Sequence, residues 1–434
     1  METVLVIGGG GREHAIVRAL APDAEVYALA SNRNPGIDAL AAGFEIADGT
    51  DTDAVVDYAT EIGADAAVVG PESALAAGVA DALEEAGVFT FGPTADAARI
   101  ETDKAYQREF MAENDIPGTP GFETFDSAAA AADYVEEIDE DVAVKPTGLT
   151  GGKGVRVTGD QVSHAEAADY VRESDHDEWV IEERLVGEEF TVQAFVADGV
   201  VRPTPAVQDH KRAYEGDEGP NTGGMGSYSD AGPMLPFMTR EDYRDAVEIL
   251  SATVDALPEY TGVLYGQFML TAEGPKVVEF NARFGDPEAM NVLPVMGTPL
   301  LDIVTAAREG DRLPEPAFDD RATVCKYAVP AGYPKDPDSG AEITVDESTV
   351  EVAAEAHGGD ALLFYASVDS REDGLFTTTS RSFAVVGVAD DIPTAEAIAA
   401  DALGAAGEKL RVREDIGTAE LVQSRIDHVA SLRD

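Results

Sequence analysis

The stretch VLVIGGGGREH, residues 4–14, joins an apolar strand pattern directly to four glycines and then to a helical pattern. Short apolar runs and helical patterns continue to alternate through the first hundred residues. This βαβ order predicts a parallel sheet with helices on both faces. We therefore expect an α/β fold that begins with a doubly wound parallel-sheet domain over residues 1–101.

The glycine-rich turn favours an anion site, but not one for NAD. Backbone N–H groups at the start of the following helix can bind a phosphate, and a turn needed only for packing is the alternative. In a dinucleotide fingerprint the third glycine would fall on Glu13 or His14, and an acidic residue would stand where Arg33 does. Residues 70–72 and 92–93 follow other strands of the predicted sheet, at the end where such sheets bind ligands.

The composition indicates a folded protein with a strongly acidic surface. The formal net charge is −54, from 84 Asp+Glu against 30 Lys+Arg, and 44% of the residues are hydrophobic. The acids are spread across periodic segments, which excludes a disordered chain, and their charge disfavours nucleic acid and anionic membranes as partners. We expect adaptation to concentrated salt, because the Debye length falls to ~3 Å at about 1 M salt and surface repulsion then largely vanishes.

The single cysteine, Cys325, excludes an internal disulfide and is expected to lie in the core. The chain opens directly on a strand pattern, without a charged and then apolar leader. No apolar run reaches the length of about 18 residues that a membrane span requires. We expect a soluble cytoplasmic protein with small-molecule partners.

Breaks in the periodic patterns indicate where domains end. Proline and glycine interrupt the pattern in DIPGTPGF, residues 115–122, and the proline-rich RLPEPAFDD, residues 312–320, precedes a final mixed α/β segment. We expect a middle domain over residues 102–317, with a small subdomain at about 120–187, and a C-terminal mixed α/β domain over residues 318–434.

Two lysines flank one glycine-rich turn in VKPTGLTGGKGVRV, residues 144–157, although the whole chain has only eight lysines. A Walker P-loop is excluded, because Thr147 stands where that motif has glycine and Gly154 where it has Ser or Thr. The pattern instead predicts a hairpin that closes over phosphates as a lid, with Lys145 and Lys153 on its two limbs. Solvated surface lysines are the alternative, but the scarcity of lysine weakens it; Lys104 is a candidate on the same ground.

The most specific stretch is GVLYGQFMLTAEGPKVVEFNARFGDPE, residues 262–288. Pairing of two strands about Glu273 sets Gln267 opposite Glu279, and strand alternation puts Asn281 on the same face. Three oxygen-bearing side chains then converge, which suits Mg²⁺ bridging nucleotide phosphates. Arg283 follows on that face and suits a phosphoryl group or a carboxylate. A solvated edge strand is the alternative, but the apolar neighbours of Glu279 indicate a buried strand.

Two further stretches carry weaker signals. Residues 208–229, QDHKRAYEGDEGPNTGGMGSYS, combine charged side chains with a glycine-rich loop that could order over a substrate, whereas metal binding through His210 alone is not expected. Residues 179–189, WVIEERLVGEE, lead a strand into paired acids that could accept hydrogen bonds from a ribose.

Together these motifs closely resemble the glycinamide ribonucleotide synthetases of the ATP-grasp superfamily, nearly from end to end. VVGPE, DKAY, QDHKR, GPNTGGMG and VEFNARFGDPE carry the resemblance beside the stretches above. It implies that the middle domain is an ATP-grasp domain with a lid subdomain, and it assigns roles toward ATP and Mg²⁺ or Mn²⁺. Lys104, Lys145 and Lys153 would contact phosphates, Glu182 and Glu183 would lie near the adenine, Glu188 would take the ribose, and Gln267, Glu279 and Asn281 would hold the metal.

The resemblance also implies substrate contacts, with Arg283, Lys153 and Asp209 as catalytic residues. The substrate-binding set would comprise Gly9, Gly10, Gly11, Pro71, Glu72, Asp209, Lys211, Asn221, Thr222, Gly223, Gly224, Arg283 and Asp286. The chain departs from the family in the C-terminal domain, where it reads FYASV at 364–368 and TTTSR at 377–381. Arg381 is retained but the neighbouring glycines are not, which puts that domain's backbone contacts to substrate in doubt.

The implied reaction is the ATP-dependent ligation of glycine to 5-phosphoribosylamine through glycyl phosphate, in purine biosynthesis. Another ATP-grasp carboxylate–amine ligase or carboxylase is the nearest alternative. A NAD-linked dehydrogenase and a non-catalytic nucleotide sensor are more distant ones, and the failed fingerprint argues against the dehydrogenase.

Overall fold

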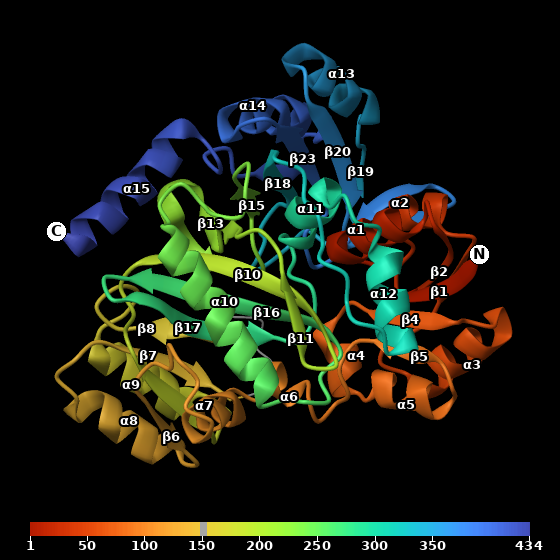
Figure 1. Cartoon of the computed structure of the whole chain (residues 1–434). Helices are drawn as coiled ribbons and strands as arrows, with labels where there is room; N and C mark the ends of the chain where they lie inside the picture. The colour runs from red at the N-terminus through yellow and green to blue at the C-terminus, as the bar shows by residue number, and fades with distance from the viewer. Residues whose placement is uncertain (148–153) are drawn as a thin grey trace.

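The computed structural model describes residues 1–147 and 154–434. Its N-terminal part is the predicted parallel sheet, with strand order β3-β2-β1-β4-β5 and helices on both faces (Figure 1). The strands are β1 (Glu2–Ile7), β2 (Ala24–Ala30), β3 (Gly43–Ile46), β4 (Ala66–Val69) and β5 (Phe89–Phe91). The helices are α1 (Gly11–Leu20), α2 (Pro35–Leu40), α3 (Thr52–Ile62), α4 (Glu72–Ala76) and α5 (Val79–Glu85).

One of the helices that the sequence pattern predicts is divided, and another begins two residues later than expected. The pattern favours one helix over 74–86, but Gly78 has φ 79°, a left-handed conformation that ends α4 and begins α5. The pattern also predicts a helix over 102–114, which is confirmed as α7 (Lys104–Glu113), and the extended Asp103 separates it from the short α6 (Arg99–Thr102). The Asp103 carboxylate caps α7 by accepting from the Tyr106 N–H. This cap fixes the position of Lys104 at the start of α7.

A small subdomain lies between residues 122 and 183 and has its own core. Its antiparallel sheet has the order β6-β9-β7-β8, and α8 and α9 cover one face. Buried alanines of both helices pack around Trp179 in a core separate from the main one. The sequence pattern missed α8. The elements are β6 (Phe122–Phe125), α8 (Ala128–Glu137), β7 (Val142–Pro146), β8 (Arg156–Val157), α9 (His164–Glu173) and β9 (Trp179–Glu183).

The larger middle sheet carries the predicted hairpin. Its order is β11-β10-β16-β17, formed by β10 (Glu188–Ala197), β11 (Val200–Pro203), β16 (Gly262–Thr271) and β17 (Gly274–Asn281), with α10 (Arg240–Asp255) packed against it. The expected register is confirmed, since Gln267 pairs with Glu279. An irregularity between Gln267 and Phe268 shifts the register by one residue, since Phe268 pairs with Val277 and both are buried.

The C-terminal sheet includes strands from the middle of the chain. Its order is β12-β15-β18-β23-β20, and β24 also pairs with β18. The buried Cys325 lies on β18, as expected of a core residue. These strands are β12 (Gln208–Asp209), β15 (Gly226–Ser229), β18 (Ala322–Pro330), β20 (Asp360–Tyr365), β23 (Phe383–Ala389) and β24 (Leu410–Val412). Because β12 and β15 join this sheet, the loop after Asp209 lies between the middle and C-terminal regions.

The last helix, α15 (Ala419–Arg433), reaches back from the C-terminal region to β10 and β16 (Figure 1). Among the described residues no helix is both long and apolar enough to cross a membrane. The other elements are β13 (Arg212–Tyr214), β14 (Glu218–Asn221), α11 (Ala289–Val292), α12 (Leu300–Glu309), β19 (Glu342–Ile343), α13 (Glu347–His357), β21 (Val368–Arg371), β22 (Gly374–Thr377) and α14 (Ile392–Ala402).

Candidate active site

Lys145, at the end of β7, is buried in an ion-pair cluster. Its Nζ lies 2.8 Å from Glu182 Oε2, and Arg108 Nε lies 2.8 Å from Glu182 Oε1. Burial raises the pKa of Glu182, but the two cations outweigh it and the net pKa is lowered. The solvated-surface alternative therefore fails for Lys145. Both oxygens of Glu182 already accept from cations, so this carboxylate is engaged within the cluster; the sequence analysis missed Arg108.

The other residues that the resemblance assigns to ATP have different contacts. Glu183 is exposed and pairs with Lys276 Nζ at 2.6 Å, whereas Glu188 is buried and faces α15. Lys104 begins α7, and its charge is one of the causes that lower the pKa of Glu279. Lys153 lies outside the described residues. Lys145 and Glu182 thus meet beside β17, and Glu183 contacts Lys276 of the same strand, whereas Glu188 is directed toward α15.

The three predicted metal ligands converge on cations. Lys211 Nζ donates to Gln267 Oε1 at 2.5 Å and lies 3.6 Å from Glu279 Oε1, and Arg283 donates to Asn281 Oδ1 at 3.2 Å. Burial raises the pKa of Glu279, but Lys211, Lys104 and Lys145 outweigh it and lower the pKa to about 2. Each oxygen therefore already faces positive charge, and the set fits a hard cation.

A second carboxylate stands beside this set and was missed. Gln267 Nε2 donates to Glu189 Oε2 at 2.6 Å, on the neighbouring strand β10. Within residues 1–147 and 154–434 no group of three His, Cys, Asp or Glu side chains is placed to hold a metal ion. A metal on this hairpin would therefore depend on amide oxygens as well as on the Glu279 carboxylate.

A buried carboxylate pocket lies next to the hairpin. Tyr265 Oη donates to Glu288 Oε1 at 2.9 Å, and Thr191 Oγ1 donates to Tyr265 Oη at 3.1 Å. Asp209 Oδ1 is buried with no hydrogen-bond partner among the described residues. Burial raises the pKa of Asp209 to about 8, with Lys211 opposing the shift and Glu288 adding to it. Glu288 ends the quoted stretch FGDPE, but a chain with 84 acids hides such a signal.

Arg283 joins the hairpin to the N-terminal domain. Besides Asn281, its Nη2 lies 2.8 Å from Glu101 Oε1 and its Nε 3.6 Å from Glu72 Oε2. Glu101, a further residue that the sequence analysis missed, also accepts from the Ala282 N–H at 2.6 Å. Burial raises its pKa to about 7 although Arg283 opposes the shift. Arg283 thus contacts both Asn281 of the proposed metal ligands and Glu72 of the N-terminal domain.

The glycine-rich turn differs from the open anion site that the sequence predicts. The Gly10 N–H donates to Glu13 Oε2 at 2.6 Å, and Arg12 pairs with the same carboxylate. The chain's own acid therefore takes one of the donors at the start of α1. A Cβ built on Gly10 would stand 3.8 Å from Asp286 Oδ2, and one on Gly8 would stand 3.0 Å from Pro71 Cδ. The glycine-rich turn thus lies beside Asp286 at Gly10 and beside Pro71 at Gly8.

The C-terminal domain reaches this region through Arg381. Its Nη2 lies 3.1 Å from Asp286 Oδ2, and its Nη1 donates to Gly224 O at 3.0 Å and to Gly223 O. Tyr327 on β18 donates to Asp286 Oδ1 at 2.6 Å. Thr222 Oγ1 closes the loop by donating to Lys211 O at 2.7 Å, and Asn221 pairs with Arg212 in register. The altered sequence at 377–381 therefore still brings Arg381 to residues 221–224.

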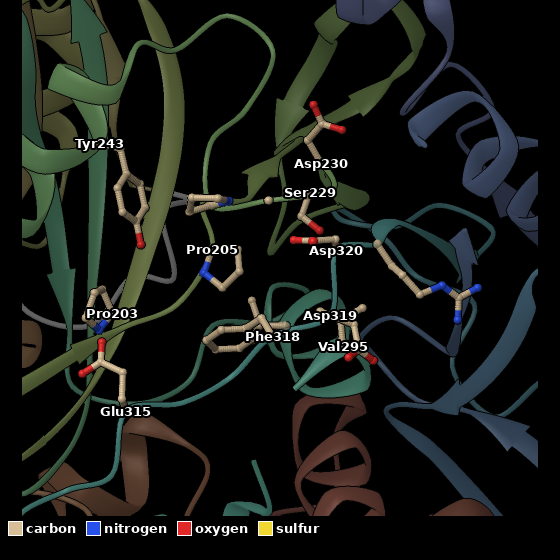
Figure 2. Close-up of a pocket in the computed structure, with 14 residues that line it drawn as sticks. Pro203, Pro205, Ser229, Asp230, Tyr243, Val295, Glu315, Phe318, Asp319 and Asp320 are labelled. Carbon is tan, nitrogen blue, oxygen red and sulfur yellow. The ribbon is translucent and has the colours of Figure 1, made fainter. Parts of the chain in front are cut away.

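A separate cavity lies elsewhere in the molecule. It has a volume of about 370 Å³ and contains none of the predicted site residues. Figure 2 shows Pro203, Pro205, Phe318 and Val295 around it, with Asp230 and Asp320 nearby. The candidate active site is instead built from the ion-paired clusters described above.

Comparison with known proteins defines the class of this site. Sequence models of the N, ATP-grasp (A) and C domains of phosphoribosylglycinamide synthetase match residues 2–101, 102–289 and 323–419. The biotin carboxylase domain of the Hydrogenobacter thermophilus 2-oxoglutarate carboxylase shares the fold, with a TM-score of 0.72 at 16% identity over 100% of this chain and 94% of that one. The chain therefore has the fold and the domain organisation of an ATP-grasp enzyme.

Relatives that are similar over the full length narrow this class. Phosphoribosylamine–glycine ligases of Methanococcoides burtonii and Methanosarcina barkeri are each 52% identical over 99% of both chains. The crystal structure of the Thermotoga maritima phosphoribosylamine–glycine ligase has a TM-score of 0.78 and 26% identity, covering 95% of this chain and 99% of that one. The chain belongs to the phosphoribosylglycinamide synthetase family and is a ligase that forms a C–N bond. The methanogen relatives give no support to the expected adaptation to salt.

Proposed function

We propose that the chain joins glycine to 5-phosphoribosylamine at the expense of ATP, in the cytoplasm, as a step of purine biosynthesis. A carboxylate is a poor electrophile, so glycine is first phosphorylated by ATP to glycyl phosphate and ADP. The amine of phosphoribosylamine then attacks the acyl carbon, and phosphate leaves as glycinamide ribonucleotide forms. The relatives' shared name supports this reaction, as does a site that can hold three anionic ligands together.

The observation that carries the proposal is the double contact of Arg283. One guanidinium touches Asn281 of the hairpin and Glu72 at the edge of the N-terminal sheet. A side chain in this position can face the transferred phosphoryl group on one side and the second substrate on the other. Lys145 and Lys104 would neutralise the nucleotide phosphates, together with Lys153 of the lid.

Mg²⁺ or Mn²⁺ would be held by Gln267, Glu279 and Asn281. The fit rests on three hard oxygen donors that already face cationic groups, and Lys211 would give up its contacts to the ion. A bound ion would shield the negative charge of the nucleotide phosphates and polarise the transferred group. Lys211 would then be free to turn its ammonium group toward Asp209, whose charge raises the Lys211 pKa against the effect of burial.

The buried carboxylates suit the amino group of glycine. Asp209 Oδ1 lacks a partner, and Glu288 is held in place by Tyr265 and Thr191. Burying an ammonium group requires such acceptors, because an unpaired buried charge is strongly unfavourable. Asp209 and Glu288 would therefore bind the glycine ammonium, and Arg283 would bind its carboxylate.

Phosphoribosylamine would bind between the N-terminal turn and the C-terminal domain. Gly10 lies beside Asp286, which pairs with Arg381 at the 221–224 loop, and Gly8 lies beside Pro71. Arg381 is already ion-paired, so it offers a positioned guanidinium for the phosphate of the substrate. Glu13 would have to release the Gly10 N–H if that donor is to bind phosphate as well.

The test is the release of ADP by the purified chain. We expect ADP release only when both glycine and phosphoribosylamine are present, with glycinamide ribonucleotide as the product. Another ATP-grasp carboxylate–amine ligase would release ADP with a different acid or amine, and a carboxylase would respond to bicarbonate. ADP release that needs neither glycine nor phosphoribosylamine would contradict the proposal.

A further inference from the structure

Glu101 is a buried carboxylate that contacts both the backbone and a side chain of the segment that follows β17. It lies on α6, just before Lys104, the first residue of α7. Its Oε2 accepts from the Ala282 N–H at 2.6 Å, and its Oε1 lies 2.8 Å from Arg283 Nη2. One side chain therefore fixes two successive residues at the end of the hairpin.

The outer edge of β17 is covered by side chains of this corner. β17 is the last strand of the order β11-β10-β16-β17, so its outer backbone groups have no neighbouring strand in the described part of the chain. Gln107 Nε2, on α7, donates to Phe280 O at 3.3 Å, and Glu101 accepts from the Ala282 N–H just past the strand. Of the two, Glu101 also holds a side chain of the candidate active site.

Arg283 keeps one donor that no described residue accepts. Its Nη2 contacts Glu101 and donates to Asn281 Oδ1 at 3.2 Å, and its Nη1 donates to Phe284 O at 3.2 Å. Its Nε is buried and has no hydrogen-bond partner among the described residues, since Glu72 Oε2 lies 3.6 Å away. An unpaired buried donor is unfavourable, so this N–H suits an anionic ligand that accepts from it.

We propose that Glu101 is a positioning residue for the reaction, because its carboxylate fixes the Arg283 guanidinium and leaves the Nε–H for the anionic end of the acid substrate. The inference rests on the proposed function only in taking Arg283 as a group that contacts this substrate. Glu72 is the alternative holder, but its side chain is 36% exposed and its contact is 3.6 Å, against 5% and 2.8 Å for Glu101. A guanidinium that is held in place loses less freedom on binding, so the contact favours the substrate by preorganisation.

The test is a double-mutant cycle on the full-length chain with Glu101→Gln and Arg283→Ala. ADP release is measured at about pH 8, where Glu101 is charged because burial raises its pKa only to about 7. We expect Glu101→Gln to lower kcat/KM for glycine about thirtyfold and to change the KM for ATP less than about twofold. In the Arg283→Ala background the same change should lower kcat/KM less than about twofold, because no guanidinium is left to position.

Added ethylguanidinium gives a second readout. Arg283→Ala retains the Glu101 carboxylate, which can pair with a free guanidinium, so ethylguanidinium should raise its ADP release at least about fivefold. The double variant should show no such rescue. Ethylammonium at the same concentration is the chemical control, because it lacks the planar pair of donors that matches a carboxylate. Equal rescue with and without the Glu101 carboxylate would overturn the inference.

Gln107→Met is the matched control, since Gln107 contacts the same edge of β17 but has no hydrogen bond to Arg283 in the described part of the chain. It should lower the melting temperature and change kcat/KM for glycine less than about twofold. If Glu101→Gln behaves like Gln107→Met, or lowers kcat/KM equally in both backgrounds, Glu101 only holds the strand edge and the inference is wrong. If the wild type requires another acid in place of glycine, the proposed function fails instead, and the same cycle with that acid still decides the role of Glu101.

Discussion

Lys211 and Glu279 face each other across the candidate site, with Nζ and Oε1 3.6 Å apart. Each shifts the pKa of the other toward the charged form, against the opposing effect of burial. The same ammonium group donates to Gln267 Oε1. One lysine thus balances the charge of the hairpin that is proposed to bind a metal ion, and the two cations would compete for the same oxygens.

Glu279→Gln tests this hairpin. The change keeps the shape and an oxygen but removes the only carboxylate of the proposed ligand set. We expect kcat to fall at least about a hundredfold, on the order of 3 kcal/mol in the barrier, with part of the loss restored by excess Mg²⁺ or Mn²⁺. Steady-state kinetics across a metal titration measures both effects. Because the pKa of Glu279 is lowered to about 2, its charge stabilises the native site, so the melting temperature of Glu279→Gln should be measured beside the kinetics and a modest fall is expected.

Glu273→Gln is the matched control, because Glu273 is an exposed glutamate on the turn of the same hairpin. It should leave the metal dependence unchanged. Near-normal turnover of Glu279→Gln at limiting Mg²⁺ would remove the metal site from this hairpin.

Arg381→Ala tests the C-terminal domain's part in binding the phosphate of phosphoribosylamine. We expect the KM for phosphoribosylamine to rise at least about tenfold, because a charged hydrogen bond to phosphate is lost, while the KM for ATP changes little. Arg371→Ala is the control, since Arg371 pairs with Asp369 and stacks on Phe376 on the same domain. Equal effects on ATP and phosphoribosylamine would indicate a general loss of structure and would count against the assignment.

The residues that the sequence could predict are those with local signals. The sequence predicts the hairpin from its turn and flanking apolar residues, but Gln267 lies opposite Glu279 only because an irregularity between Gln267 and Phe268 shifts the register that the turn sets. The left-handed conformation of Gly78 divides a helix that the sequence predicts as continuous. The sequence pattern does not distinguish such a glycine from one in a regular helix. The short elements α2 and β3 were missed for a similar reason, since each is too short for its periodicity to be recognised.

The partners of the predicted residues could not be found in the same way. Arg108 meets Glu182 across 74 positions and His428 meets Glu188 across 240, and no periodic pattern connects such pairs. Glu13 accepts from the Gly10 N–H. Its position in the first stretch shows only that the third glycine of a dinucleotide fingerprint is absent, and it does not show this contact. Glu288 and Glu101 carry no signal beyond being two acids among 84. Tertiary pairing, not local preference, decides all of these contacts.

Glu288→Gln tests the proposed glycine subsite. Glutamine can still accept from Tyr265 Oη, so the packing is kept while the negative charge is lost. We expect the KM for glycine to rise at least about tenfold, with the KM for ATP nearly unchanged. Glu347→Gln is the control, because Glu347 also accepts from a tyrosine, Tyr365, but is exposed on α13. An unchanged KM for glycine in Glu288→Gln would refute the role of this carboxylate.

The net charge of −54 predicts a dependence on salt, for which the relatives offer no support. Acidic surface groups repel one another unless ions screen them, so activity and melting temperature should both rise between about 0.1 M and about 1 M KCl. NaCl at equal ionic strength should act in the same way, because screening depends on ionic strength and not on the identity of the cation. Full activity and stability in dilute buffer would rule out adaptation to salt.

We expect the buried His14 to make the free energy of unfolding fall at acidic pH. It is buried in α1 against Phe364, with ring centroids 5.4 Å apart, and burial is the main reason that its pKa falls to about 4. A histidine in the unfolded chain has a pKa near 6.5, so between these values the unfolded state binds a proton that the native state does not. The free energy of unfolding that His14 contributes is therefore present above pH ~6.5 and is lost as the pH falls toward 4, by on the order of 3 kcal/mol.

The comparison of wild type with His14→Gln isolates this contribution, because Glu101 and Asp209, whose pKa values are raised, shift stability in the opposite direction over the same range in both proteins. Glutamine does not titrate, so its free energy of unfolding should fall less steeply between pH 7.5 and 4.5. Denaturant melts at fixed ionic strength measure the two slopes. His176→Gln, in an exposed loop, should follow the wild-type curve. Parallel curves for wild type and His14→Gln would show that His14 accepts a proton in the native state after all.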